Sequence, residues 1–169
     1  NDQVATTTRI YLRTRLQSLS NDLHELLSVL TENARRHLHV IIPGYTHMQQ
    51  AQPISLGHYW LSWFEAFYRD MKRLNFVLEA LNECPLGAGA LAGSTLPIDR
   101  EMTSELLGFR TPTRNSLDTV AQRDYMTDYH YFASVLMIHI SRLCNDLITW
   151  NSQEFGFIVL PDEFCTGSS

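Results

Sequence analysis

Several features are scarce in this 169-residue sequence, and each scarcity excludes a class of protein. Cys84, Cys144 and Cys165 are far apart and lack CxxC or histidine-rich spacing, so neither a disulfide framework nor a metal site is predicted. No apolar run approaches the roughly 20 residues that cross a bilayer, and no charged segment leads into an apolar one at the start. The composition favours a reducing, cytoplasmic location with no membrane contact and with Cys144 as a buried apolar side chain.

Positive charge is also scarce. Thirteen Lys and Arg against eighteen Asp and Glu give a net charge of −5, and the basic residues form no block that could follow a phosphate backbone. The balance therefore argues against a nucleic-acid partner. The apolar fraction of 44% is high enough to exclude a disordered chain and to build one sizeable core.

Leucines dominate the first part of the chain at helical spacing. They recur at intervals of three and four residues, with charged residues on the other faces: Leu16, Leu19, Leu23, Leu26, Leu27 and Leu30. This periodicity predicts one long amphipathic helix over about residues 2–37.

Two further long helices are predicted by the same pattern. One spans about residues 54–81, and the other begins near Ser116, whose hydroxyl could cap it, and ends at 150–152. A short helix over 98–107 stops at Gly108. At about 1.5 Å per residue the long helices reach about 50 Å, more than one chain of this size can cover. The sequence therefore predicts an all-α bundle of long helices that packs against partner chains.

An interruption at residues 43–53 separates the first two helices. Pro43, Gly44 and Pro53 prevent helix continuation there. Thr46 and His47 offer a hydroxyl and a ring that titrates near neutral pH. Neutral amides follow them: Gln49, Gln50 and Gln52. The stretch is predicted to be either a binding loop or an exposed connector between helices.

Other polar residues have competing interpretations. The remaining histidines of interest are interpreted as structural, at helix ends or among apolar neighbours: His37, His39, His58, His130 and His139. A polar group near the start of the third long helix is interpreted as a surface ion-pair cluster or as a substrate contact: Asp118, Gln122, Arg123 and Asp124. The glycine-rich segment 84–97 lacks the GxxxxGK[ST] pattern, which argues against nucleotide binding.

Six stretches, in this order and spacing, resemble the middle part of argininosuccinate lyase: residues 1–6, 43–53, 85–93, 115–118, 152–157 and 166–169. Tyr45 before Thr46-His47, and Gln52 before Pro53, favour this family over fumarase, aspartase and adenylosuccinate lyase of the same superfamily. The resemblance covers the whole chain. It implies that residues 1–169 form a single helical-bundle region, the central helical domain of the fumarase/aspartase superfamily.

The resemblance also implies an activity and an assembly. The family cleaves argininosuccinate to arginine and fumarate by anti elimination, without metal or organic cofactor, in homotetramers whose active sites each draw on three chains. Ser168 matches the family's proposed catalytic base, and His47 matches the histidine assigned to proton transfer with the leaving group. Asn1 and Thr46 match substrate-binding positions, and Gln49 and Gln52 are supporting candidates.

Truncation and two alternatives qualify this hypothesis. The family's serine loop continues beyond Ser169, and further segments precede Asn1, so this chain alone is expected to show negligible turnover. One alternative is a superfamily lyase acting on a different fumarate adduct. The other is a non-enzymatic scaffold of the delta-crystallin kind, which would assemble but not turn over.

Overall fold

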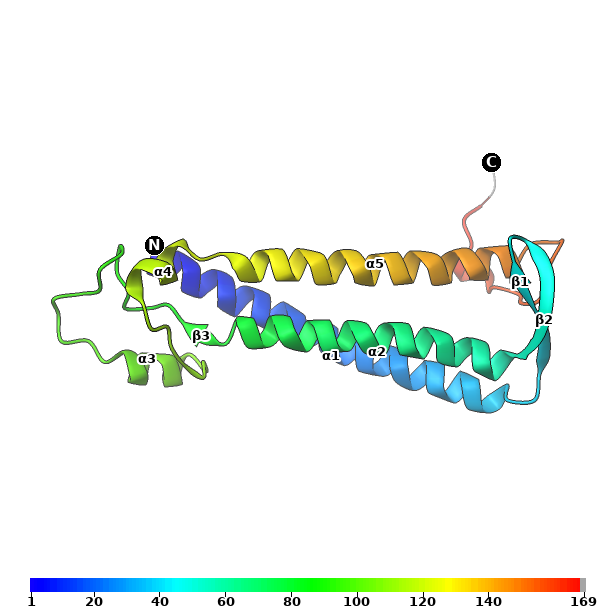
Figure 1. The fold of residues 1–169 in the computed structure, drawn as a ribbon, viewed down its shortest axis with the longest axis horizontal. Helices are drawn as coiled ribbons and strands as arrows, with labels where there is room; N and C mark the ends of the chain where they lie inside the picture. The colour runs from blue at the N-terminus through cyan, green and yellow to red at the C-terminus, as the bar shows by residue number, and fades with distance from the viewer. Residues whose placement is uncertain (168–169) are drawn as a thin grey trace.

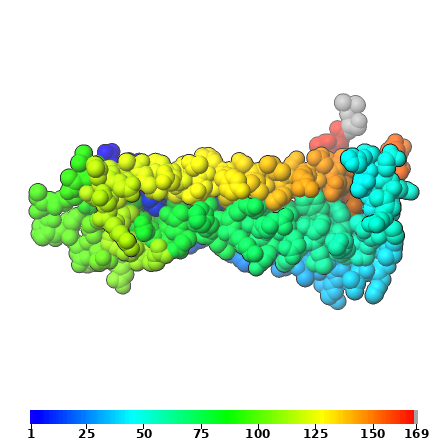
Figure 2. Space-filling model, in the orientation of Figure 1, coloured from blue at the N-terminus to red at the C-terminus, as the bar shows by residue number. Residues whose placement is uncertain are grey.

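The computed structural model describes residues 1–167, and its main feature is a rod of three long helices (Figures 1 and 2). These helices are α1 (Asp2–Arg36), α2 (Leu56–Ala80) and α5 (Asp124–Trp150). The shorter elements lie at the two ends of the rod: β1 (Ile41–Thr46), β2 (Gln49–Ser55), β3 (Glu83–Cys84), α3 (Arg100–Leu106), β4 (Thr111–Pro112), α4 (Ser116–Ala121) and the 3-10 turn Asp162–Phe164. The predicted all-α class is confirmed, with small two-stranded additions.

Helix α2 packs against both α1 and α5, and the apolar core follows it along the rod. Phe67 and Leu74 of α2 are fully buried, as are Tyr125 and Phe132 of α5. The leucine stripe expected on α1 supplies the opposite wall, where Leu16 is 2% exposed. Burial of such side chains stabilises the fold by about 1.5–3 kcal/mol each, so these contacts hold α1 and α5 against α2.

The hairpin β1–β2 is the main departure from the sequence expectation. Residues 43–53 were predicted to be a loop, and the second helix was predicted to start near residue 54. The strands pair in antiparallel fashion from Ile41 opposite Ser55 to Thr46 opposite Gln49, and α2 begins only at Leu56. Prolines exclude a helix but are compatible with an edge of a two-stranded ribbon, where Pro43 lies opposite Pro53.

The third long helix is also shorter than predicted, because a break separates α4 from α5. Gln122 has extended backbone angles (φ −66°, ψ 127°), and α4 is capped by the Asn115 side chain rather than by Ser116. The Arg9 guanidinium donates to the Gln122 side chain at 2.8 Å and to the Ala80 carbonyl at 2.9 Å. This buried tertiary contact holds the break, and periodicity could not reveal it.

Helix α5 leaves much of its surface uncovered within this chain. Cys144, predicted to be buried, is exposed, and so is Met137, which the spacing placed in the core. Large apolar side chains on α1 and α2 are exposed as well, including Tyr11 and Phe76. The helices are therefore too long and too apolar to cover one another, as the sequence predicted. No helix among residues 1–167 has the length and hydropathy of a membrane span.

Candidate active site at the hairpin end

The tip of the hairpin presents His47. Thr46 and Gln49 pair across the end of the ribbon, so His47 and Met48 form a two-residue turn. Both have positive φ, 53° and 60°. Such turns suit the right-handed twist of the strands but normally contain asparagine and glycine. This stretch has His-Met instead of an asparagine-glycine pair, and for that reason a hairpin was not predicted here.

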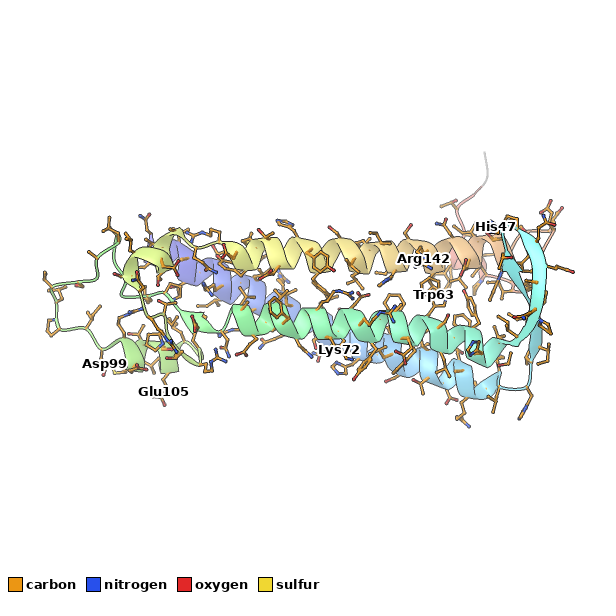
Figure 3. All side chains as sticks on the ribbon, in the orientation of Figure 1. His47, Trp63, Lys72, Asp99, Glu105 and Arg142 are labelled. Atoms are coloured by element: carbon orange, nitrogen blue, oxygen red, sulfur yellow. The ribbon has the colours of Figure 1, made fainter. Side chains whose placement is uncertain are left out.

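The turn is strained, since the left-handed region costs residues other than glycine roughly 1–2 kcal/mol each. Histidine tolerates this region better than most residues, whereas methionine does not share that tolerance. A conformation of this kind persists only when its surroundings hold it. His47 is exposed, and it lies at the hairpin end of the rod (Figure 3).

The hairpin also forms one wall of a cavity of about 370 Å³ against α2 and α5. Its lining includes Thr46 and Gln52 from the hairpin and Tyr59, Asp146 and Trp150 from the helices. The Tyr59 hydroxyl donates to the Asp146 carboxylate at 3.0 Å, and burial raises the pKa of that hydroxyl. These three helix residues were not singled out from the sequence, because nothing local marks them as neighbours of residues 43–53.

The predicted site residues are therefore only partly gathered in this chain. Thr46, His47 and Gln49 lie together at the hairpin tip, and Gln52 follows on β2. Asn1 lies at the opposite end of the rod (Figure 1), beside the short elements. Ser168 lies outside the described residues. Within one copy, Asn1 and His47 are too far apart to contact the same small molecule.

The structure also answers the competing interpretations of other polar residues. His139 lies in the core region, with Nδ1 2.6 Å from the Asp70 carboxylate, as a structural histidine would. His130 is exposed on α5. The expected ion-pair cluster at residues 118–124 forms no ion pair among the described residues. No group of three His, Cys, Asp or Glu side chains within residues 1–167 is arranged to hold a metal ion.

At the Asn1 end, Asp2 ties helix α1 to the glycine-rich segment after α2. One carboxylate oxygen accepts the N–H groups of Gly87 and Gly89, each at 2.9 Å, and the other accepts that of Gln3 at 2.8 Å. Both glycines have positive φ, and a Cβ on Gly89 would meet the Gly93 carbonyl at 2.6 Å. The glycines are therefore required for this close turn around the carboxylate.

These contacts predict how stability depends on pH. Burial alone raises the pKa of Asp2, but the donated N–H groups of Gly89, Gly87 and Gln3 hold it below its ordinary value. A depressed pKa in the folded state gives stability that is complete above about pH 4 and is lost as the pH falls through the folded pKa. We expect Asp2→Asn to reduce the free energy of unfolding at neutral pH, with the difference from the unsubstituted protein shrinking on acidification.

Urea denaturation across the acid range measures this effect. The exposed Asp22→Asn on the same helix is the matched control and should change stability little. A difference between the Asp2 variant and the unsubstituted protein that stays constant from neutral to strongly acid pH would contradict the interpretation.

Comparison with known proteins places this architecture in a family. The family model described as "Lyase" matches residues 1–169. The chain belongs to this lyase family. The match extends over the three-helix rod, the hairpin and the segment after α5.

Curated relatives of this lyase-family chain are argininosuccinate lyases. The protein from Synechococcus sp. (strain JA-3-3Ab) is 52% identical over all 169 residues, and the chain covers 35% of it. The protein from Saccharophagus degradans (strain 2-40 / ATCC 43961 / DSM 17024) is 51% identical over the same length, with 36% of it covered. The resemblance inferred from the sequence is confirmed. The chain spans about a third of the length of the curated relatives that it matches.

Solved structures of lyases share the fold. An EDDS lyase in complex with formate has a TM-score of 0.96 and 31% identity over the whole chain, which corresponds to 34% of that structure. A fumarate lyase:delta crystallin from Brucella melitensis bound to cobalt has a TM-score of 0.79 over 89% of the chain, covering 34% of that structure, at 22% identity. The second likeness concerns the fold alone.

Proposed function

We propose that the complete protein containing this chain is an argininosuccinate lyase, which cleaves argininosuccinate to arginine and fumarate by anti elimination. The observation that carries the proposal is the identity of about half of all 169 residues to argininosuccinate lyases. The Tyr45-Thr46-His47 sequence supports it, since Thr46 and His47 are exposed at the tip of the hairpin, where they could contact a substrate. The product arginine links the reaction to arginine biosynthesis.

In this proposal two side chains move protons. Ser168 removes a proton from the carbon next to a substrate carboxylate. His47 transfers a proton to the departing guanidinium nitrogen. A histidine suits this role because its pKa lies near the working pH. A serine hydroxyl needs nearby positive charge or oriented donors to act as a base. Neither step requires a metal or an organic cofactor.

The substrate contacts are assigned to polar residues around these two. Asn1 and Thr46 bind the substrate, with Gln49 and Gln52 in support. Asn1 lies at the far end of the rod from the other three, so one site must take residues from several copies. A homotetramer, with residues 1–169 as one helical region of each subunit, supplies those copies and covers the exposed apolar faces of α1, α2 and α5. We place this assembly in the cytoplasm.

Fumarate release tests the proposal. The complete protein, incubated with argininosuccinate, should produce fumarate and arginine in equal amounts, detected by ultraviolet absorbance and amino-acid analysis. Turnover should reach the order of 10 per second that is ordinary for enzymes. A protein that assembles fully but releases no fumarate would be the scaffold of the delta-crystallin kind.

A second candidate is a lyase acting on another fumarate adduct. The likeness to the EDDS lyase structure favours keeping it, because 31% identity extends over the whole chain. Assays with other N-substituted aspartates, and measurement of ammonia or AMP as the co-product, separate the two. Faster turnover of any such adduct than of argininosuccinate would replace the proposed substrate.

A further inference from the structure

A cluster of aromatic rings joins the hairpin to the segment that follows α5. The Tyr45 ring lies 5.2 Å from that of Phe155 and 6.3 Å from that of Phe157, between centroids. Phe157 contacts Trp150 at 5.9 Å, and Trp150 contacts Tyr59 at 4.3 Å. Edge-on and tilted contacts at these distances are favourable aromatic geometries. Tyr45 of the hairpin therefore contacts the segment after α5 directly, and Phe157 connects that segment to Trp150 of α5 and through it to Tyr59 of α2.

The segment that carries Phe155 and Phe157 is itself held against the end of α5. The Phe157 N–H donates to the Trp150 carbonyl at 2.9 Å, and the Gly156 N–H donates to the Ser152 carbonyl at 2.8 Å. Farther on, the Leu160 N–H donates to the Asn151 side chain at 2.8 Å. These bonds hold residues 152–160 against the end of α5, and this segment is called the wall below.

Tyr45 connects this wall to the strained turn. It stands two residues before His47 and pairs with Gln50 across the ribbon. Its ring contacts Phe155 and Phe157 of the wall, so the strand that leads into the positive-φ turn at His47 and Met48 is packed against it. The Tyr45 hydroxyl receives only a long hydrogen bond, 3.4 Å from the Gln50 amide, so the ring makes the main contact.

We propose that Tyr45 and Phe155 are positioning residues that hold the His47 turn in its left-handed conformation and so aim the imidazole. Without the aromatic support the turn relaxes toward ordinary backbone angles, and His47 loses its orientation toward a bound substrate. The catalytic part of this inference rests on the proposed function. The structural part, support of the turn by the wall, does not depend on it.

Variants of Tyr45 in the complete, assembled protein test the inference. Tyr45→Ala removes the ring, while Tyr45→Phe keeps it and removes only the hydroxyl. We expect Tyr45→Ala to lower kcat by about 10–100-fold, as displacement of a catalytic group does, with KM changed much less. Tyr45→Phe should stay within about twofold of the unsubstituted protein in both constants. Phe155→Ala should behave like Tyr45→Ala.

Hydrogen exchange provides a readout that needs no substrate. In Tyr45→Ala the amides of residues 46–50 should exchange faster while those of α2 and α5 remain as protected as before. Faster exchange along the helices as well would indicate a general loss of stability and would overturn a specific role of Tyr45. Unchanged exchange at the turn would also overturn it. An unsubstituted protein without argininosuccinate turnover would refute the proposed function, and the exchange result would still decide the inference. Normal kcat in Tyr45→Ala, with an active unsubstituted protein, would overturn the aiming of His47.

Discussion

Replacement of His47 by asparagine is expected to lower kcat of the complete protein by about 10²–10⁴-fold, the usual contribution of a general acid or base. Asparagine adopts the left-handed region readily, so the turn with φ 53° at this position should keep its shape. The variant removes the imidazole and leaves the backbone in place. The loss should therefore appear in the chemical step rather than in folding.

Steady-state assay of fumarate release, together with the thermal midpoint of unfolding, measures both quantities. His39→Asn is the matched control, since His39 is also exposed, lies in the connection that leads from α1 into the hairpin, and has no assigned role. The control should retain full activity. A His47→Asn enzyme within about threefold of the unsubstituted kcat would remove His47 from the mechanism.

Asp70→Ala is expected to destabilise the protein by about 3–5 kcal/mol. The substitution removes a fully buried carboxylate and leaves its two partners, His139 and Arg73, without it. The Asp70 side chain has no exposed surface. One carboxylate oxygen lies 2.6 Å from His139 Nδ1 of α5, and the other accepts from Arg73 at 3.0 Å. Loss of this carboxylate removes a polar link between α2 and α5 and leaves a cavity in the core.

Urea denaturation at one fixed protein concentration measures this change, because oligomers are also stabilised by mass action. Glu65→Ala on the exposed face of the same helix is the control and should cost less than about 0.5 kcal/mol. Similar stabilities for the two variants would show that the Asp70 contacts contribute little net free energy.

The helices were largely predictable from local patterns. Apolar residues at three- and four-residue spacing placed α1 within about one residue of its observed limits. Gly108 follows the end of α3 with φ 68°, as the short-helix prediction expected, whereas the helix begins at Arg100, after the Asp99 cap, rather than at residue 98. The break before α5 was not predictable, because Arg9 holds it from a distant part of the chain.

The candidate site was predictable in residue type but not in shape. Thr46 and His47 stood out because a simple connector has no need of a hydroxyl beside an imidazole. Their placement at a strained hairpin tip escaped prediction, since His-Met carries no signal for such a turn. Asp146 and Trp150 escaped as well, because they meet the hairpin only through packing of α5 on α2.

By itself, the sequence determined the helical class, the extent of α1 and the family, because periodic burial and ordered motifs are properties of the chain read in one dimension. Tertiary structure alone decided which end of the rod each polar residue occupies and which φ values His47 and Met48 adopt. The physical reason is that aromatic packing against Phe155 and the Arg9 contacts act between residues far apart in the chain. Their energies outweigh local preference only once the helices lie side by side.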